Sequence, residues 1–263
     1  MRKTLLLAAL TTLLLPVFAA AQSPFDGTWK TNMNNVQFPT KPDVYVLKDG
    51  RYQCKTCVPP IDIKADGSDQ PVKDPYIDTM AVKVINDHEI EITGKKAGKT
   101  VQHQKVTISP DGNTLNFEFT DSSNTNGAPV TGKGEETRVA KGPAGSSPVS
   151  GSWRMKKMGD ISQNAITYTY KTHGDEITMT NGTGQTYTAK MDGTDAPMKG
   201  DPGVTSVSVK RTGKNTFEET DKRDGKVIGV FKATISSDGK TLTGVYEDKE
   251  HGTTAKFTAT KQG

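Results

Sequence analysis

The sequence has 263 residues and a formal net charge of +4, and only 32% of its residues are hydrophobic and 6% aromatic. Lysine and glutamate are interspersed without a basic cluster, which argues against a nucleic-acid-binding protein. Strand-forming residues nevertheless recur at regular spacing throughout the chain, which is typical of a folded β-rich protein and not of a disordered one.

The first 21 residues have the features of a secretory signal peptide. Arg2 and Lys3 precede an apolar run from Leu5 to Phe18, and an A-x-A pattern before Gln22 predicts cleavage after Ala21. The apolar run is shorter than the roughly 20 residues of a membrane-spanning helix. Its removal would reduce the net charge from +4 to +2. We therefore expect a secreted protein, periplasmic or extracellular, with no membrane insertion and no lipid anchor.

Three motifs occur twice in the same order, at offsets of 124, 126 and 127 residues. Such nearly constant spacing indicates a tandem duplication. A tract rich in glycine, proline and serine separates the copies and is typical of a linker. We expect a signal peptide at 1–21, domains at residues 22–141 and 150–263, and a linker at 142–149. The repeated motifs are GTWK (27–30) with GSWR (151–154), KADGSDQP (64–71) with KMDGTDAP (190–197), and ISPDGNTL (108–115) with ISSDGKTL (235–242).

Each copy is predicted to contain eight short strands bounded by turn residues. The alternation of Leu115, Phe117 and Phe119 with polar residues indicates one buried face. Asp-Gly pairs such as Asp49-Gly50 favour tight antiparallel turns. The predicted strands of the first copy are 27–32, 44–48, 51–55, 80–85, 89–93, 100–108, 114–120 and 130–139. Those of the second copy are 151–156, 166–171, 176–180, 204–210, 216–220, 226–235, 241–246 and 253–260.

These strands predict an all-β fold made of two tandem eight-stranded antiparallel up-and-down barrels. Interior side chains of such a barrel either fill it or surround one small ligand. A membrane barrel would require longer strands with the apolar face outward, so this class is not favoured.

The Gly-x-Trp that opens each copy, with Trp29 and Trp153, resembles the lipocalin and wider calycin pattern. The segment 187–242 is similar to a group of secreted bacterial lipocalin-like proteins of unassigned function. This resemblance implies a barrel with an apolar ligand as cargo and no catalytic chemistry. Lipocalins also place an arginine of the last strand against the tryptophan, and Arg138 is the candidate partner of Trp29. The second copy has Lys256 and Lys261 in that region.

Cys54 and Cys57 form a Cys-x-x-Cys motif at the end of a predicted strand. A redox-active motif normally begins at a helix N-terminus, where the thiolate is stabilised. In an oxidising compartment an isolated pair of this kind usually forms a disulfide. We predict a disulfide, with a redox site or half of a metal site as the alternatives.

Candidate ligand-binding residues are the large side chains on the same face of the strands as the tryptophans. They either fill the barrel interior or line a pocket. In a pocket, tyrosine hydroxyls could orient a polar end of the ligand. These residues are Trp29, Tyr52, Met80, Phe117, Trp153, Tyr168, Tyr170 and Tyr246.

The sequence suggests no catalytic residues, no metal site and no cofactor. The histidines are scattered, and the acidic turns that begin at Asp66 and Asp192 lack the further ligands of an EF-hand loop, although a bound cation is an alternative there. Two functional hypotheses remain. The first is a secreted protein that binds a small, partly apolar ligand in one or both barrels. The second is a filled-barrel module of the cell envelope that contacts another protein or a glycan.

Overall fold

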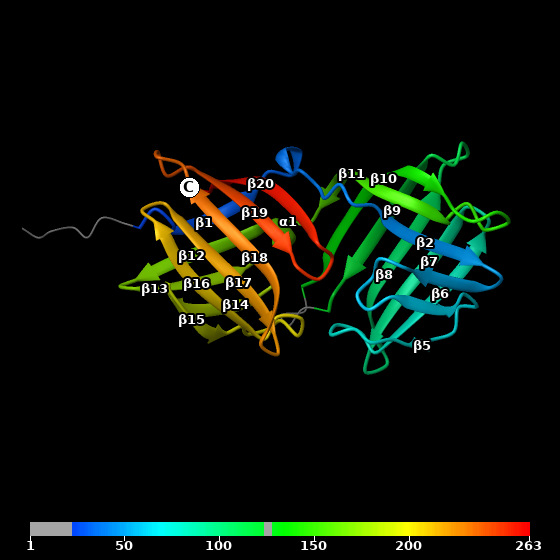
Figure 1. Cartoon of the computed structure of the whole chain (residues 1–263), viewed down its shortest axis with the longest axis horizontal. Coiled ribbons are helices and arrows are strands. Elements are labelled where there is room, and N and C mark those ends of the chain that lie inside the picture. Colours follow the sequence, from blue (N-terminus) through cyan, green and yellow to red (C-terminus); the bar gives the residue numbers. More distant parts are fainter. Residues whose placement is uncertain (1–22, 124–127) are drawn as a thin grey trace, which may run out of the picture.

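The computed structural model describes residues 23–123 and 128–263, so the predicted signal peptide, residues 1–21, lies outside the described residues. The strands form two antiparallel sheets, and each sheet curves into a nearly closed barrel (Figure 1). The predicted pair of all-β barrels is therefore confirmed. The number of strands is corrected from eight to ten in each barrel.

The first barrel is built from one continuous stretch of chain, residues 43–161. Its strands follow one another around the barrel as an up-and-down meander, and β11 pairs with β2 to join the end of this stretch to its beginning. The two ends of this sheet are β4 and β5, and a backbone hydrogen bond from Gly67 N to Val82 O (2.9 Å) helps to close the gap between them. The strands are β2 (Asp43–Lys48), β3 (Arg51–Cys54), β4 (Ile61–Lys64), β5 (Gln70–Pro71), β6 (Thr79–Asn86), β7 (Glu89–Lys96), β8 (Lys99–Ile108), β9 (Thr114–Asp121), β10 (Val130–Lys141) and β11 (Gly151–Ile161).

The second barrel combines the C-terminal half of the chain with the first strand of the N-terminal half. Strand β1 lies between β20 and β12 and pairs with both. Reciprocal backbone hydrogen bonds between Thr186 and Lys199 (2.9 and 3.0 Å) close the opposite gap. The strands are β1 (Gly27–Thr31), β12 (Thr167–His173), β13 (Glu176–Asn181), β14 (Thr186–Lys190), β15 (Asp192–Pro197), β16 (Ser206–Gly213), β17 (Thr216–Arg223), β18 (Lys226–Ile235), β19 (Thr241–Asp248) and β20 (Thr253–Lys261).

The two copies therefore exchange their first strands, and Figure 1 shows β1 among the strands of the C-terminal barrel. The expected domains, 22–141 and 150–263, differ from the sheets at these two strands. The reason lies in the linker, which turns the chain sharply enough for β11 to form a hairpin with β10. Ser147 N donates to Leu47 O (2.9 Å) and Ser150 Oγ accepts from Leu47 N (2.8 Å), so the linker itself is bonded to β2.

Two short helices lie in the segments that cross between the barrels. The 3₁₀ helix η1 (Met33–Asn35) follows β1, and α1 (Gln163–Ile166) follows β11. Within the described part of the chain, no helix is long and apolar enough to cross a membrane.

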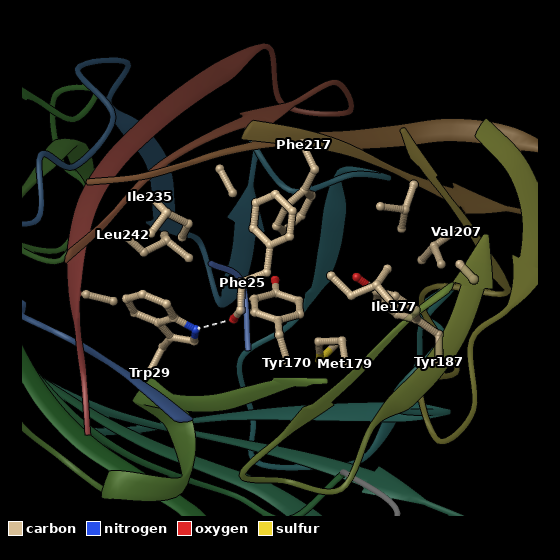
Figure 2. Packing of buried hydrophobic residues seen from close by; sticks show 14 of the residues in the cluster. Phe25, Trp29, Tyr170, Ile177, Met179, Tyr187, Val207, Phe217, Ile235 and Leu242 are labelled. Atoms are coloured by element: carbon tan, nitrogen blue, oxygen red, sulfur yellow. Dashed lines mark hydrogen bonds between the residues drawn. The ribbon is translucent and has the colours of Figure 1, made fainter. Parts of the chain in front are cut away.

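Each exchanged strand carries its tryptophan into the core of the other copy's barrel. Trp29 is fully buried in the second barrel, where its indole Nε1 donates to Phe25 O (3.0 Å; Figure 2). Trp153 is fully buried in the first barrel and donates to Val149 O at the same distance. The predicted pairing of Arg138 with Trp29 is thereby corrected, because the Arg138 guanidinium lies 3.9 Å from the ring centroid of Trp153.

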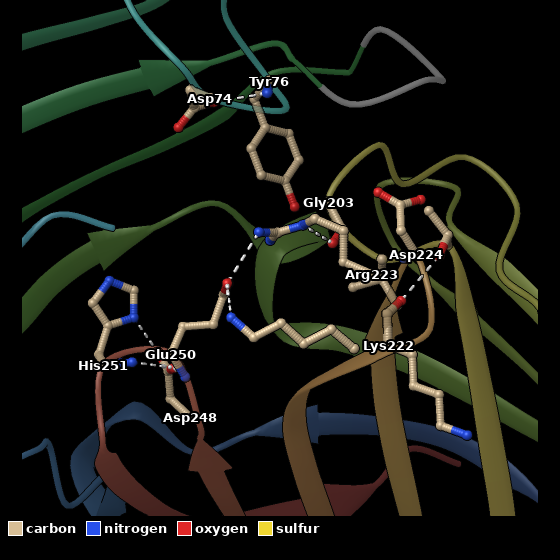
Figure 3. A network of polar contacts seen from close by, with 12 residues as sticks. Asp74, Tyr76, Gly203, Lys222, Arg223, Asp224, Asp248, Glu250 and His251 are labelled. Atoms are coloured by element: carbon tan, nitrogen blue, oxygen red, sulfur yellow. Dashed lines mark hydrogen bonds and ion pairs between the residues drawn. The ribbon is translucent and has the colours of Figure 1, made fainter. Parts of the chain in front are cut away.

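Loop contacts also fix one barrel against the other (Figure 3). The Tyr76 hydroxyl, from the first barrel, donates to Asp201 Oδ1 (2.9 Å) in the second barrel. Its ring covers Gly203, where a Cβ atom would come within 2.1 Å of the Tyr76 hydroxyl oxygen. Arg223 Nε donates to Gly203 O (2.8 Å) and Arg223 pairs with Glu250 (3.1 Å), which holds the receiving loop in place.

The strand exchange predicts which barrel each tryptophan stabilises. Replacing a buried tryptophan by alanine costs about 3–5 kcal/mol. For Trp29→Ala we expect faster amide hydrogen exchange in β12 and β20 of the second barrel, while β2 and β10 keep their protection. Hydrogen-exchange mass spectrometry measures this, and Trp153→Ala should give the reverse pattern. Lost protection in β2 after Trp29→Ala would contradict the exchange.

Candidate functional site

The first barrel contains a cavity of about 300 Å³, and its lining includes two solvent-exposed residues, His103 and Thr120, so the cavity is open to solvent. A second, smaller cavity of about 40 Å³ lies deeper in the same barrel. The two share four lining residues and so are neighbours along one interior path. Those shared residues are Tyr45, Tyr52, Ile92 and Gln104.

The wall of the larger cavity is mainly apolar, with a few polar groups near the rim. Met80, Ile61 and Phe119 supply apolar surface, and Gln102 donates to Asp121 Oδ2 (3.2 Å) close to the opening. Small-molecule sites in proteins commonly combine an apolar wall with few polar groups in this way.

The strand register explains why this interior is partly empty. Leu115 and Leu242 occupy equivalent positions in the repeat, so their neighbours in the sheets can be compared between barrels. The first barrel has Ile90 and Gln104 where the second has Phe217 and Phe231, whose ring centroids lie 6.1 Å apart. The third phenylalanine, Phe257, corresponds to Gly134, but there the ring has only changed strands, because Phe117 of the first barrel corresponds to Gly244 of the second.

One further residue enlarges this difference. Phe25 packs at 5.2 Å, edge to face, against Phe217 in the second barrel, where the first barrel has the smaller Val149 at the equivalent position, four residues before the tryptophan. Aromatic rings therefore occupy in the second barrel the space that is open in the first (Figure 2). A duplicated fold thus carries one filled and one partly hollow interior.

The small cavity ends at a buried carboxyl group. Glu136 on β10 is 5% exposed, and its Oε2 atom has no hydrogen-bond partner among the described residues. Burial raises the pKa of the Glu136 carboxyl to about 7, and the negative charge of Asp43 adds to the rise. Leaving a buried polar atom without a partner costs free energy, so this group requires a function or an unseen partner.

Two tyrosines on the neighbouring strands β2 and β3 line the small cavity together with Glu136. The rings of Tyr45 and Tyr52 are stacked, with centroids 6.2 Å apart and planes 19° apart. Burial raises the pKa of both hydroxyls well above the ordinary tyrosine value. Both side chains therefore stay neutral at physiological pH and present aromatic surface to the cavity.

The cysteine motif forms part of the wall of the larger cavity. Cys54 and Cys57 are joined by a disulfide with an S–S distance of 2.06 Å, and both line the cavity. The Cys57 N–H also donates to Cys54 Sγ (3.1 Å). The predicted disulfide is therefore present, and it ties the chain after β3 into a tight turn that forms part of the cavity wall.

A different acidic cluster occupies the second barrel. Glu219 and Asp221 on β17 are 7% and 8% exposed, and the Tyr187 hydroxyl donates to Glu219 Oε2. Burial raises the pKa of Glu219 to about 8, with the Asp221 charge adding to the rise, and burial also raises the pKa of Asp221. These carboxyls are packed among side chains and have a tyrosine donor, unlike Glu136.

A shallower hollow of about 600 Å³ lies over β8, β9 and β10. It is lined mostly by polar side chains, among them Glu118, Lys105 and Lys133, and Lys133 pairs with Asp160 at 2.6 Å. Its charges are of both signs and partly paired with one another. The interior cavity is therefore the better candidate for an apolar ligand.

The predicted ligand-binding residues separate into three groups. Tyr52, Met80 and Phe117 line the first barrel's cavities. Trp153 is fully buried core of that barrel. The remaining four lie in the second barrel, with Tyr246 facing Asp221. These are Trp29, Tyr168, Tyr170 and Tyr246, of which Trp29 and Tyr170 are buried in its core and Tyr168 packs against that core.

Sequence reasoning missed Glu136, Tyr45 and Gln104, which line the deep part of the cavity. Both faces of β10 are polar around Glu136, because Glu135 and Thr137 flank it. Alternation therefore gave no indication of which face is buried. Leu115 is buried and pairs with Glu136 on β10, so the strand register identifies Glu136 as an inward residue. The sequence alone does not give this register.

The acidic turns are explained by local hydrogen bonds. Asp66 Oδ1 accepts from the backbone N–H of Ser68 (2.9 Å), and Asp192 Oδ1 accepts from that of Thr194 (2.8 Å). These are the bonds expected of such turns. Within the described ranges, no three histidine, cysteine, aspartate or glutamate side chains are grouped so that they could hold a metal ion.

Compared with known proteins, the chain matches no family model and no curated protein.

The raised carboxyl pKa in the second barrel predicts a stability that falls as pH rises. The folded protein binds a proton at Glu219 between about pH 4.5 and 8, where the unfolded chain does not. Each tenfold change in proton affinity corresponds to about 1.4 kcal/mol. We expect the free energy of unfolding from urea titrations to decrease from pH 5 to pH 9.

Glu219→Gln should flatten this pH dependence, because glutamine does not ionise and keeps an acceptor for the Tyr187 hydroxyl. Glu218→Gln makes the same chemical change on the opposite face of β17 and serves as the matched control. An unchanged slope in Glu219→Gln would show that this carboxyl does not cause the pH dependence.

Proposed function

We propose that this is a secreted, lipocalin-like protein whose first barrel binds a small, partly apolar ligand. The observation that carries the proposal is the interior cavity of about 300 Å³, which continues toward the buried Glu136. Ligand pockets in proteins usually measure about 300–1,000 Å³. The cavity therefore suits a small molecule and not a protein segment or a long lipid.

The second copy has a different role in this proposal. Phe217, Phe231 and Phe257 occupy the interior of the second barrel, and the second copy also supplies β11 to the binding barrel. Binding by one barrel predicts one ligand per chain. An envelope module that contacts a protein or glycan through its surface is the alternative, and it predicts no occupied interior.

A fluorescence titration with N-phenyl-1-naphthylamine, a neutral apolar probe, tests the binding function. We expect saturable binding with one probe per chain, and we expect Gln104→Phe to weaken it at least tenfold. This variant places in the first barrel the side chain that the second barrel has at the equivalent position, Phe231. Filling the cavity removes the space for the probe without introducing a charge.

Lys105→Gln is the matched control, since Lys105 is the next residue on β8 and points away from the interior. It should bind the probe like the wild type. Two probes per chain, or equal binding by Gln104→Phe and the wild type, would contradict a site in the first barrel. No binding at all would favour the surface module.

A further inference from the structure

Glu136 is the feature of the cavity that a purely apolar ligand leaves unexplained. The small cavity that Glu136 lines measures about 40 Å³, and roughly 10–15 Å³ measured in this way is enough for one water molecule. The unpartnered Oε2 atom is itself inaccessible to solvent, and the Glu136 residue is 5% exposed. The floor of the cavity thus offers an acceptor and the space for a small polar group.

The surroundings of Glu136 are acidic and aromatic. Asp43 on β2 is the charged neighbour that raises the pKa of Glu136, and Tyr45 and Tyr52 are neutral. Arg138, two residues further along β10, donates to the carbonyl oxygens of Pro148 (2.6 Å), Ser150 (2.7 Å) and Gly112 and stacks on Trp153. Its guanidinium is therefore already bonded elsewhere.

The other residues around the small cavity carry no charge. Positive charge beside a carboxylate is stabilised, and aromatic faces also attract cations. An anionic ligand would meet repulsion at this floor. The uncharged residues of this lining are Ile90, Ile92, Gln104, Val106, Leu115, Phe117 and Val149.

We propose that the ligand of the first barrel carries a protonated amine or similar cationic nitrogen, which pairs with Glu136 while its apolar part contacts Tyr45, Tyr52 and Met80. This inference rests on the proposed binding function and adds the chemical class of the ligand. The second barrel provides the contrast, because its buried Glu219 already accepts a hydrogen bond from Tyr187. Among residues 23–123 and 128–263, no group donates a hydrogen bond to Glu136 Oε2.

Three probes with the same eight-carbon chain test the charge of the ligand by isothermal titration calorimetry at pH 8. They are octylammonium, octanol and octanoate. We expect octylammonium to bind most tightly, octanol roughly 10- to 100-fold more weakly, and octanoate most weakly, since a charged hydrogen bond to a buried group dominates the difference. Equal binding of octylammonium and octanol, or tighter binding of octanoate, overturns the inference and leaves the binding function intact.

Glu136→Gln keeps the shape of the side chain and removes its charge. We expect this variant to lose the preference for octylammonium and to bind octanol as the wild type does. Glu219→Gln, which neutralises a buried carboxyl in the other barrel, is the matched control and should keep the preference. An unchanged preference in Glu136→Gln overturns the inference.

The pH dependence provides an independent readout. Octylammonium must displace the proton of Glu136, whose pKa is about 7, so wild-type affinity should fall roughly 30-fold between pH 8 and pH 5.5, while octanol affinity changes little. If no member of the series binds at any pH, the proposed binding function fails together with the inference. A pH-independent affinity for octylammonium overturns the inference and leaves the binding function intact.

Discussion

Both barrels depend on a strand supplied by the other half of the chain. Without β1, the second barrel would expose the edges of β12 and β20, and without β11 the first would expose β2 and β10. Exposed edges are costly because their backbone groups lack partners. Each exchanged strand also carries a tryptophan whose indole N–H bonds to a backbone carbonyl four residues earlier, which fixes the strand against its new core.

This mutual dependence allows the two interiors to diverge. Because one barrel is packed with phenylalanine rings, it contributes stability that the other does not need to produce from its own core. The first barrel can then have isoleucine and glutamine where its partner has Phe217 and Phe231, and can hold Glu136 where the partner has Ala259. Polar or missing interior side chains lower stability locally, and they are also what a binding site requires.

The sequence predicted the duplication and most of the strands, because repeats and period-two alternation are local signals. It did not predict β4 or β14, or the short β5 and β15, which close the barrels. The segment with β15 contains Asp192 and Thr194, whose hydrogen bond forms a turn at the same place as an irregular strand. Turn chemistry was therefore correctly recognised there, but the strand was not.

The exchange could not be predicted because the two first strands are nearly interchangeable. GTWK and GSWR fit either gap, so local pattern does not distinguish the exchanged arrangement from the simple one. The cavity residues were hidden for a related reason. Whether Tyr52 lines a cavity or fills the core depends on the size of the side chains across the barrel from it. Which side chains lie there is determined by the register of all the strands.

The position of β1 has a consequence for biosynthesis. Residues 27–31 leave the ribosome early, yet one of their final partners is β20, which ends at residue 261. Before β11 pairs with β10 and β2, the gap between these two strands could be filled by β1 as well as by β11. Only residues 142–150 separate β11 from β10, so the hairpin closes that gap by a short loop and leaves β1 for the last barrel. The strand that is translated first, β1, is thus among the last to complete its pairing.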